Sequence, residues 1–172
     1  MGLAEDILNR LIAEQQALYG KGPVVYRPEV SIVPLYVVDT SVILKWYHRD
    51  GEDLTHIALK LRDKYAAGRI ALITPELALY ELTNVLCCKK KLEDAKVIEA
   101  LDHLLSFSIT RSLDGAGFSK AIHLSSAKGI SIYDASFAAL AMANNCSLIT
   151  VDERLCKKLD NAMLLQEMDG LL

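Results

Sequence analysis

Short apolar runs alternate with stretches of helical periodicity along most of the chain. Residues 35–38, 70–73 and 147–150 are runs of four residues that carry no charge, as expected of strands that are buried on both faces. A fourth strand is predicted at residues 108–113. Strands that alternate with helices and are too apolar to face water predict an α/β domain with a parallel sheet covered on both faces.

Capping signals predict where the intervening helices begin. Asp53 can cap a helix whose apolar stripe continues to Tyr65 and which ends at Gly68. Thr74, Pro75 and Glu76 form a helix start, with a capping hydroxyl, a proline at the first helical position and an acid near the positive end of the dipole. That helix is expected to run to about residue 91. Further helices are expected at residues 92–106, at residues 116–127 and from Ser131 onward.

The first 34 residues differ from this alternating pattern. Residues 3–19 place apolar side chains at helical spacing, and Gly20 provides a C-terminal stop. Residues 21–34 contain three prolines and suit an extended connector. We therefore expect an N-terminal amphipathic helix and connector over residues 1–34, and the α/β domain over residues 35–172.

Composition excludes several classes of protein. Of 172 residues, 52% are apolar and 24% are charged, so the chain can close one hydrophobic core and is not expected to be disordered. No apolar run reaches membrane-spanning length, and charged residues interrupt the N-terminal segment too often for a signal peptide, which predicts a cytoplasmic protein with no membrane contact. The four cysteines lack metal-ligand or redox spacing. A net charge of −3 excludes a broad basic surface.

Four carboxylates occupy positions that suit a catalytic site. Asp39 directly follows the first predicted strand, and Asp152 lies two residues beyond the strand at 147–150. Because ligands of parallel α/β sheets bind outside the carboxyl ends of the strands, both acids are expected at the same rim. Glu81 and Asp134 lie on predicted helices among apolar or small residues.

Each acid also has an ordinary structural interpretation. Asp134 follows Ser131 in an S-x-x-D capping pattern, Asp152 can cap a final helix, Asp39 can cap a helix or form an Asx-turn, and Glu81 can be a solvated helix residue. Convergence of all four would instead favour a metal-dependent hydrolase. Mg²⁺ and Mn²⁺ prefer oxygen ligands, and a cation keeps clustered carboxylates ionised.

The segments around these acids are VVDTSVILKW, ITPELALYELTNVL, ISIYDASFAALA and LITVDERL, in this order. With them, residues 35–159 resemble the PIN domain family, and most closely its VapC-like toxin ribonucleases. The resemblance implies an α/β/α sandwich with a central parallel sheet and an endoribonuclease that depends on Mg²⁺ or Mn²⁺. It further implies that Asp39, Glu81, Asp134 and Asp152 form the acidic, metal-binding quartet, with Ser41 and Thr150 as supporting hydroxyls.

The same resemblance implies partners. Toxin members of the family pair with a small antitoxin and commonly form a homodimer. The RNA substrate needs positive contacts, for which Arg154, Lys157 and Lys158 are candidates just beyond Asp152. About 34 residues precede the first motif, more than in many toxin members, so a PIN nuclease of RNA processing or ribosome maturation is an alternative. A non-catalytic PIN-like binding module is another.

Other classes with a similar fold lack their required residues here. A response-regulator receiver domain would have an adjacent acidic pair after the first strand, and a HAD-type phosphatase would have D-x-D, whereas Asp39 is followed by Thr40 and Ser41. No phosphate-cradling glycine loop is present. The histidines, His48, His56, His103 and His123, show no ligand spacing.

Overall fold

The computed structural model describes residues 33–48 and 53–172. The helix and most of the connector predicted within residues 1–34 lie outside the described residues. Within the described part of the chain, no helix is long and apolar enough to span a bilayer.

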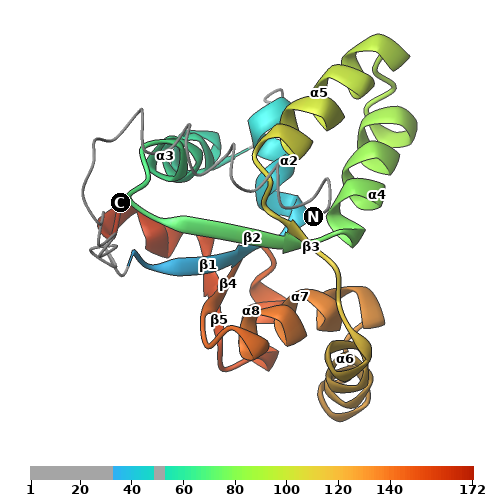
Figure 1. The fold of residues 1–172 in the computed structure, drawn as a ribbon, viewed down its shortest axis with the longest axis vertical. Coiled ribbons are helices and arrows are strands. Elements are labelled where there is room, and N and C mark those ends of the chain that lie inside the picture. The colour runs from blue at the N-terminus through green and yellow to red at the C-terminus, as the bar shows by residue number, and fades with distance from the viewer. Residues whose placement is uncertain (1–32, 49–52) are drawn as a thin grey trace, which may run out of the picture. The chain divides into compact units, whose positions relative to one another are not determined.

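A five-stranded sheet forms the centre of the described domain (Figure 1). Its spatial order is β3-β2-β1-β4-β5, and every neighbouring pair is parallel. The predicted parallel α/β fold is therefore confirmed. The strands are β1 (Leu35–Val38), β2 (Ala71–Pro75), β3 (Thr110–Arg111), β4 (Ser147–Thr150) and β5 (Ala162–Leu164).

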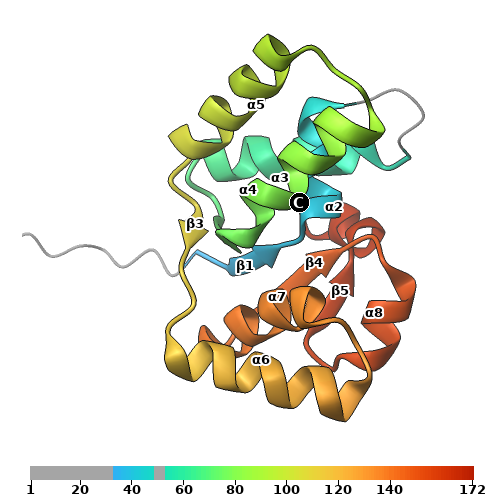
Figure 2. The ribbon, with the colours of Figure 1, turned by 90° about the vertical axis from the view of Figure 1, so that its right-hand side faces the viewer.

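Helices cover both faces of this sheet, so the domain has three layers (Figure 2). Parallel strands need crossover connections of one hand, so a change in the direction of strand progression moves the helices to the opposite face. The first layer contains α2 (Thr40–Tyr47), α3 (Thr55–Ala66), α4 (Leu77–Asn84) and α5 (Asp94–Ser106). The other contains α6 (Gly115–Lys128), α7 (Ile132–Ala143) and α8 (Glu153–Lys158).

The core explains why the central strands carry no charged residues. Val37 and Val38 of β1 and Leu148 and Ile149 of β4 are fully buried. Successive strand residues point to opposite faces, so both faces of these strands need an apolar cover. Helices from both layers provide it, with side chains such as Leu82 of α4.

Several local predictions were wrong because tertiary contacts outweighed capping signals. Thr74 and Pro75 do not start a helix but end β2, and the Thr74 hydroxyl donates a hydrogen bond to the Val38 carbonyl at 2.9 Å. The N-cap of α3 is Leu54 rather than Asp53, and the N-cap of α4 is Glu76.

Other boundaries also differ from the prediction. The strand expected at residues 108–113 is reduced to the two residues of β3. A single helix was expected to run to about residue 91. In the structure, α4 ends at Asn84 and a π-helix follows over Val85–Lys89. Sequence analysis missed β5 and the 3₁₀ helix Leu165–Gly170 that follows it.

Candidate functional site

The order in which strands are added to the sheet reverses at its centre, between β1 and β4. After β1 the chain builds outward through β2 and β3, whereas β4 returns to the other side of β1 and is followed by β5. The crevice outside the carboxyl ends of two such strands is the usual ligand site of open α/β sheets. Asp39 lies here, directly after β1, and its backbone N–H donates to the Ile149 carbonyl of β4 at 2.9 Å.

Hydroxyl groups from two segments hold the Asp39 carboxylate. Ser41 and Thr150 both donate to Asp39 Oδ2, at 2.7 and 2.6 Å. These are the two hydroxyls that the family resemblance singled out. Asp39 is the N-cap residue of α2, yet its side chain makes no capping hydrogen bond, so the capping interpretation is wrong for this residue. Its carboxylate is instead held between the Ser41 hydroxyl of α2 and the Thr150 hydroxyl of β4.

Glu81 is held by a residue whose importance the sequence did not indicate. It lies on α4 and is half-buried, and the Thr40 hydroxyl donates to Glu81 Oε2 at 2.6 Å. Thr40 is only 6% exposed. The interpretation of Glu81 as a freely solvated helix residue is therefore wrong. The sequence signal for Thr40 is its position directly after Asp39, which places it in the first turn of α2.

Asp134 is bound by the residue that caps its own helix. Ser131 is the N-cap of α7, and its hydroxyl oxygen accepts a hydrogen bond from the Asp134 N–H at 3.0 Å. The same hydroxyl donates to Asp134 Oδ2 at 2.7 Å. The predicted S-x-x-D capping pattern is therefore present, and it also orients the half-buried carboxylate.

Asp39, Glu81 and Asp134 share one electrostatic environment. Burial raises the pKa of the Asp39 carboxyl, hydrogen bonds from Thr150 and Ser41 lower it, and the charge of Asp134 raises it further. The pKa of Glu81 is also raised, first by burial and then by the charges of Asp39 and Asp134, while the Thr40 hydrogen bond opposes the shift. The charge of Asp134 therefore acts on Asp39 and Glu81 although the three acids come from separate segments of the chain.

Asp152 is linked to this group less directly. Its side chain caps α8, since Oδ1 accepts hydrogen bonds from the backbone N–H groups of Arg154 and Leu155 at 2.7 and 3.2 Å. The Asp152 N–H donates to Thr150 Oγ1 at 3.1 Å, and Thr150 in turn donates to Asp39. The capping interpretation is correct for Asp152, whose side chain is exposed.

The donor chemistry of this site fits a hard divalent cation, because it consists of carboxylate and hydroxyl oxygens. Each carboxylate of the quartet is engaged by its own hydroxyl or backbone donors. Among residues 33–48 and 53–172, no group of three or more His, Cys, Asp and Glu side chains is arranged to hold a metal ion. The carboxylates thus provide the right ligand type, but their described arrangement is not that of a formed metal site.

The candidate RNA-binding residues differ in their engagement. Arg154 is exposed at the start of α8. Lys157 pairs with Glu153 at 3.8 Å, and Lys158 Nζ donates to the Gly129 carbonyl at 2.6 Å. Two of the three predicted basic residues therefore already have partners within the domain.

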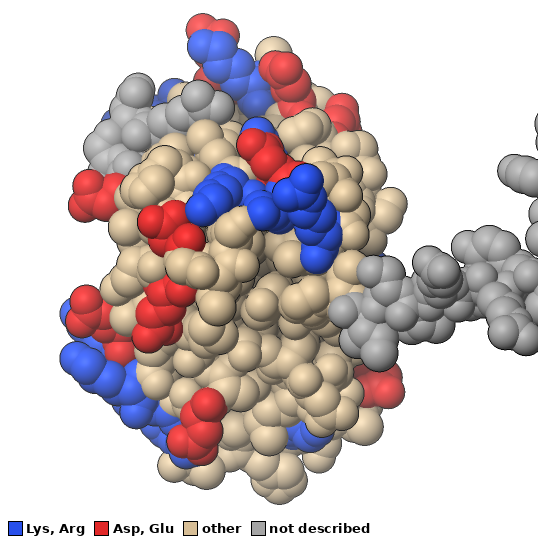
Figure 3. All heavy atoms as spheres, turned by 90° about the vertical axis from the view of Figure 1, so that its left-hand side faces the viewer, with Lys and Arg blue, Asp and Glu red and all other residues tan. Residues whose placement is uncertain are grey.

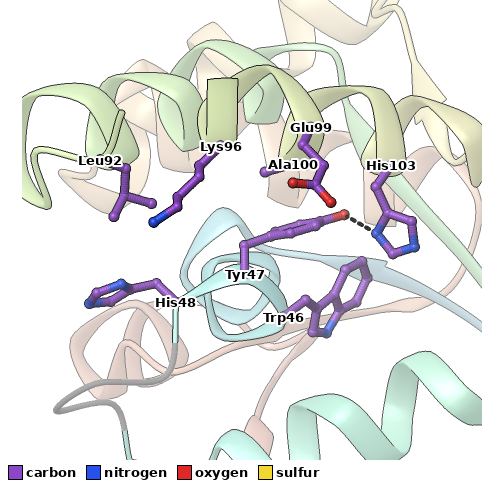
Figure 4. Close-up of a pocket in the computed structure, with 8 residues that line it drawn as sticks. All are labelled: Trp46, Tyr47, His48, Leu92, Lys96, Glu99, Ala100 and His103. Carbon is purple, nitrogen blue, oxygen red and sulfur yellow. Dashed lines mark hydrogen bonds between the residues drawn. The ribbon is translucent and has the colours of Figure 1, made fainter. Parts of the chain in front are cut away.

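A cavity of about 900 Å³ opens between the end of α2 and α5, away from the acids (Figure 4). The Tyr47 hydroxyl and His103 Nδ1 point toward each other there, 3.2 Å apart, with His48 and Lys96 at the same opening. Burial raises the pKa of the Tyr47 hydroxyl. This contact joins residues far apart in the chain, so the histidine spacing in the sequence gave no sign of it.

A family model described as PIN domain matches residues 36–160. The chain belongs to the PIN domain family. The matched region contains all four acids and the hydroxyls that hold them. No curated protein matches this PIN domain.

Three solved structures are similar to this PIN domain. PAE2754 from Pyrobaculum aerophilum is 22% identical, with 80% of this chain and 93% of that chain covered and a TM-score of 0.58. VapBC2 from Rickettsia felis, bound to a DNA fragment from its promoter, is 21% identical, with coverage of 76% and 96% and a TM-score of 0.56. A toxin-antitoxin complex from Klebsiella pneumoniae is 13% identical, with coverage of 76% and 97% and a TM-score of 0.54. At these identities the likeness shows a shared fold.

Proposed function

We propose that this PIN domain is a metal-dependent endoribonuclease and acts as the toxin of a type II toxin-antitoxin pair. The observation that carries the nuclease proposal is the Asp39 carboxylate at the carboxyl end of β1, held by Ser41 and Thr150, with the charge of Asp39 acting on Glu81 of α4. The toxin role is supported by the fold shared with VapBC2 and with the Klebsiella pneumoniae complex. The proposed partners are RNA, a small antitoxin and a second copy of the chain.

Within this proposal, Asp39 and Asp134, together with Glu81 or Asp152, would hold one or two Mg²⁺ or Mn²⁺ ions. The cation would supply Lewis-acid chemistry, which lowers the pKa of a water molecule and offsets charge that develops on the phosphate. Ser41, Thr150 and Thr40 keep the carboxylates oriented. Water attacks the phosphorus, the bond from phosphorus to the 3′ oxygen breaks, and the leaving oxygen takes up a proton to balance the one that water loses, which leaves a 5′-phosphate and a 3′-hydroxyl.

Cleavage of RNA by the purified full chain tests the nuclease proposal. We expect cleavage with Mg²⁺ or Mn²⁺ and none with EDTA. Asp39→Asn should reduce the rate by more than the roughly 10- to 100-fold typical of residues that only support a metal ligand. Asp102→Asn, an exposed aspartate of α5, is the matched control and should cleave normally. Equal rates for Asp39→Asn and wild type, or ends that carry a 2′,3′-cyclic phosphate, would contradict the proposal.

The toxin role has a separate test. Expression of the wild-type chain in a bacterial host should arrest growth, whereas expression of Asp39→Asn at the same level should not. Growth arrest by both chains would show that the effect does not depend on the proposed site.

One observation favours a second candidate, a PIN-like binding module without catalysis. The carboxylates of the candidate site accept hydrogen bonds from protein groups. Among the described residues they are not arranged as a metal-binding cluster. Thermal unfolding with and without Mn²⁺ distinguishes the two candidates. A cation that binds only the folded protein raises the unfolding temperature, and no rise at millimolar Mn²⁺ would favour the binding module.

A further inference from the structure

A second hollow lies at the same rim of the sheet as the acids. It has a volume of about 320 Å³, which falls in the range of roughly 300 to 1,000 Å³ typical of small-ligand sites. Glu76, which directly follows β2, and Ser112, which directly follows β3, both line it. Because the strands are parallel, these residues mark the carboxyl ends of β2 and β3, next to the end of β1 where Asp39 lies.

Exposed aromatic rings gather in this hollow. Tyr80 is 74% exposed, Tyr133 58% and Phe118 51%. Within residues 33–48 and 53–172, these are the exposed aromatic side chains, and all three line the hollow. Tyr80 directly precedes Glu81 on α4, and Tyr133 directly precedes Asp134 on α7. Rings this exposed add little to the core, and two of them belong to residues next to candidate catalytic acids in the chain.

The chain as a whole has no excess of positive charge with which to attract RNA. The whole chain has a net charge of −3, and two of the three basic residues near Asp152 are engaged within the domain. Figure 3 shows the opposite side of the molecule, away from the carboxyl ends of the strands, where positive and negative side chains are interspersed. Contacts to phosphates provide most of the affinity of strongly basic RNA-binding proteins, so this domain needs another source of affinity.

Base stacking provides that source. We propose that the hollow binds an unpaired nucleobase of the RNA, stacked against Tyr80, Tyr133 and Phe118, next to the phosphate that is cleaved. Every base has an aromatic face, so stacking can bind single-stranded RNA without positive charge. A base within a duplex is already stacked and paired, so it is not available to the rings. The inference rests on the proposed nuclease function and adds to it a base-binding subsite formed by three rings.

Paired substitutions test the stacking. Tyr80→Leu and Tyr133→Leu remove a ring and keep an apolar side chain, whereas Tyr80→Phe and Tyr133→Phe keep the ring. All are made in the full chain with Asp39→Asn, so that the RNA stays intact. The probe is a short single-stranded RNA that carries the fluorescent base 2-aminopurine, whose emission is quenched when it stacks.

We expect the phenylalanine variants to quench the probe as the parent does. The leucine variants should lose the quenching and bind the RNA about 5- to 100-fold more weakly. An RNA with an abasic site in place of 2-aminopurine should bind leucine and phenylalanine variants equally. Because the substituted side chains are exposed, the variants should unfold at the parent's temperature.

Two results would overturn the proposal. One is equal quenching and affinity for the leucine and phenylalanine variants. The other is a dimer, detected by light scattering, that Tyr133→Leu dissociates without a change in RNA binding. The hollow would then be an interface between copies of the chain. Cleavage by the chain with Asp39 intact is measured separately. Cleavage without ring-dependent binding contradicts only the stacking proposal, and ring-dependent binding without cleavage contradicts only the nuclease proposal.

Discussion

The Thr40 hydroxyl donates a hydrogen bond of 2.6 Å to the carboxylate of Glu81, and this bond joins the first turn of α2 to the middle of α4. Thr40 directly follows Asp39, so one short segment carries one acid of the candidate site and orients another. The orientation of Glu81 toward Asp39 and Asp134 therefore depends on a side chain that is not itself an acid.

Thr40→Val should uncouple Glu81 from α2. Valine has the shape of threonine without the hydroxyl, so the buried packing is retained while the Glu81 carboxylate loses its donor. We expect a loss of about 1–3 kcal/mol in the free energy of unfolding, measured by urea denaturation, and slower RNA cleavage. Thr40→Ser should retain both properties. Thr83→Val, which removes a hydroxyl from the same helix without touching an acid, should leave cleavage unchanged. Equal cleavage by Thr40→Val and wild type would contradict the positioning of Glu81 by Thr40.

Ser131→Ala should reveal the double role of this N-cap residue. It removes the cap of α7, which should cost about 1 kcal/mol of stability, and it also frees the Asp134 carboxylate. Asp114→Ala is the matched control, because Asp114 caps α6 through the Gly117 N–H and touches none of the candidate acids. Both variants should lose similar stability, and only Ser131→Ala should slow RNA cleavage. If both leave cleavage unchanged, Ser131 serves only as a cap.

The stability of the metal-free protein should decrease as pH rises through the titration of Asp39 and Glu81. Their pKa values in the folded state are raised above the ordinary 3.8 and 4.5. The unfolded chain therefore loses these protons at lower pH than the folded chain. The stability that the two carboxyl groups contribute is full below their ordinary pKa values and is lost as pH rises through the raised pKa values of the folded state.

Asp39→Asn tests this pH dependence, because asparagine stays neutral. In EDTA we expect Asp39→Asn to unfold at a higher temperature than wild type at pH 7, with a difference that shrinks toward pH 3. Asp102→Asn should show no such difference. A lower unfolding temperature for Asp39→Asn at pH 7 would contradict the raised pKa of Asp39.

The four cysteines should fall into two classes of reactivity. Cys87 and Cys88 are exposed on the π-helix, whereas Cys146 and Cys156 are partly buried, and burial raises the pKa of both of their thiols. Since the thiolate is the reactive form, a disulfide reagent at neutral pH should label two cysteines rapidly and two slowly. In urea all four should react at one rate. A single rate in the folded protein would contradict the assigned burial.

Local pattern was sufficient to predict the layers of the fold. The charge-free runs at β1 and β4 were predicted with their observed bounds, because a strand that is buried on both faces tolerates few other residues. β5 was missed because all three of its residues are only partly buried at the edge of the sheet, where burial constrains the sequence less. Thr74 and Pro75 resembled a helix start because the capping signal is local, while the bond from Thr74 to Val38 is not.

The amino-acid sequence by itself determined the alternation of strands and helices, the family to which the chain is similar, and the positions of the four acids. Only the tertiary structure decided how each acid is held, because Thr40 and Glu81, or Thr150 and Asp39, are far apart in the chain and meet only when the strands assemble. It also separated Asp39, which does not cap its helix, from Asp152, which does. A capping bond joins residues that are close in the chain, but whether it forms depends on donors from other segments, such as the Thr150 hydroxyl that holds Asp39.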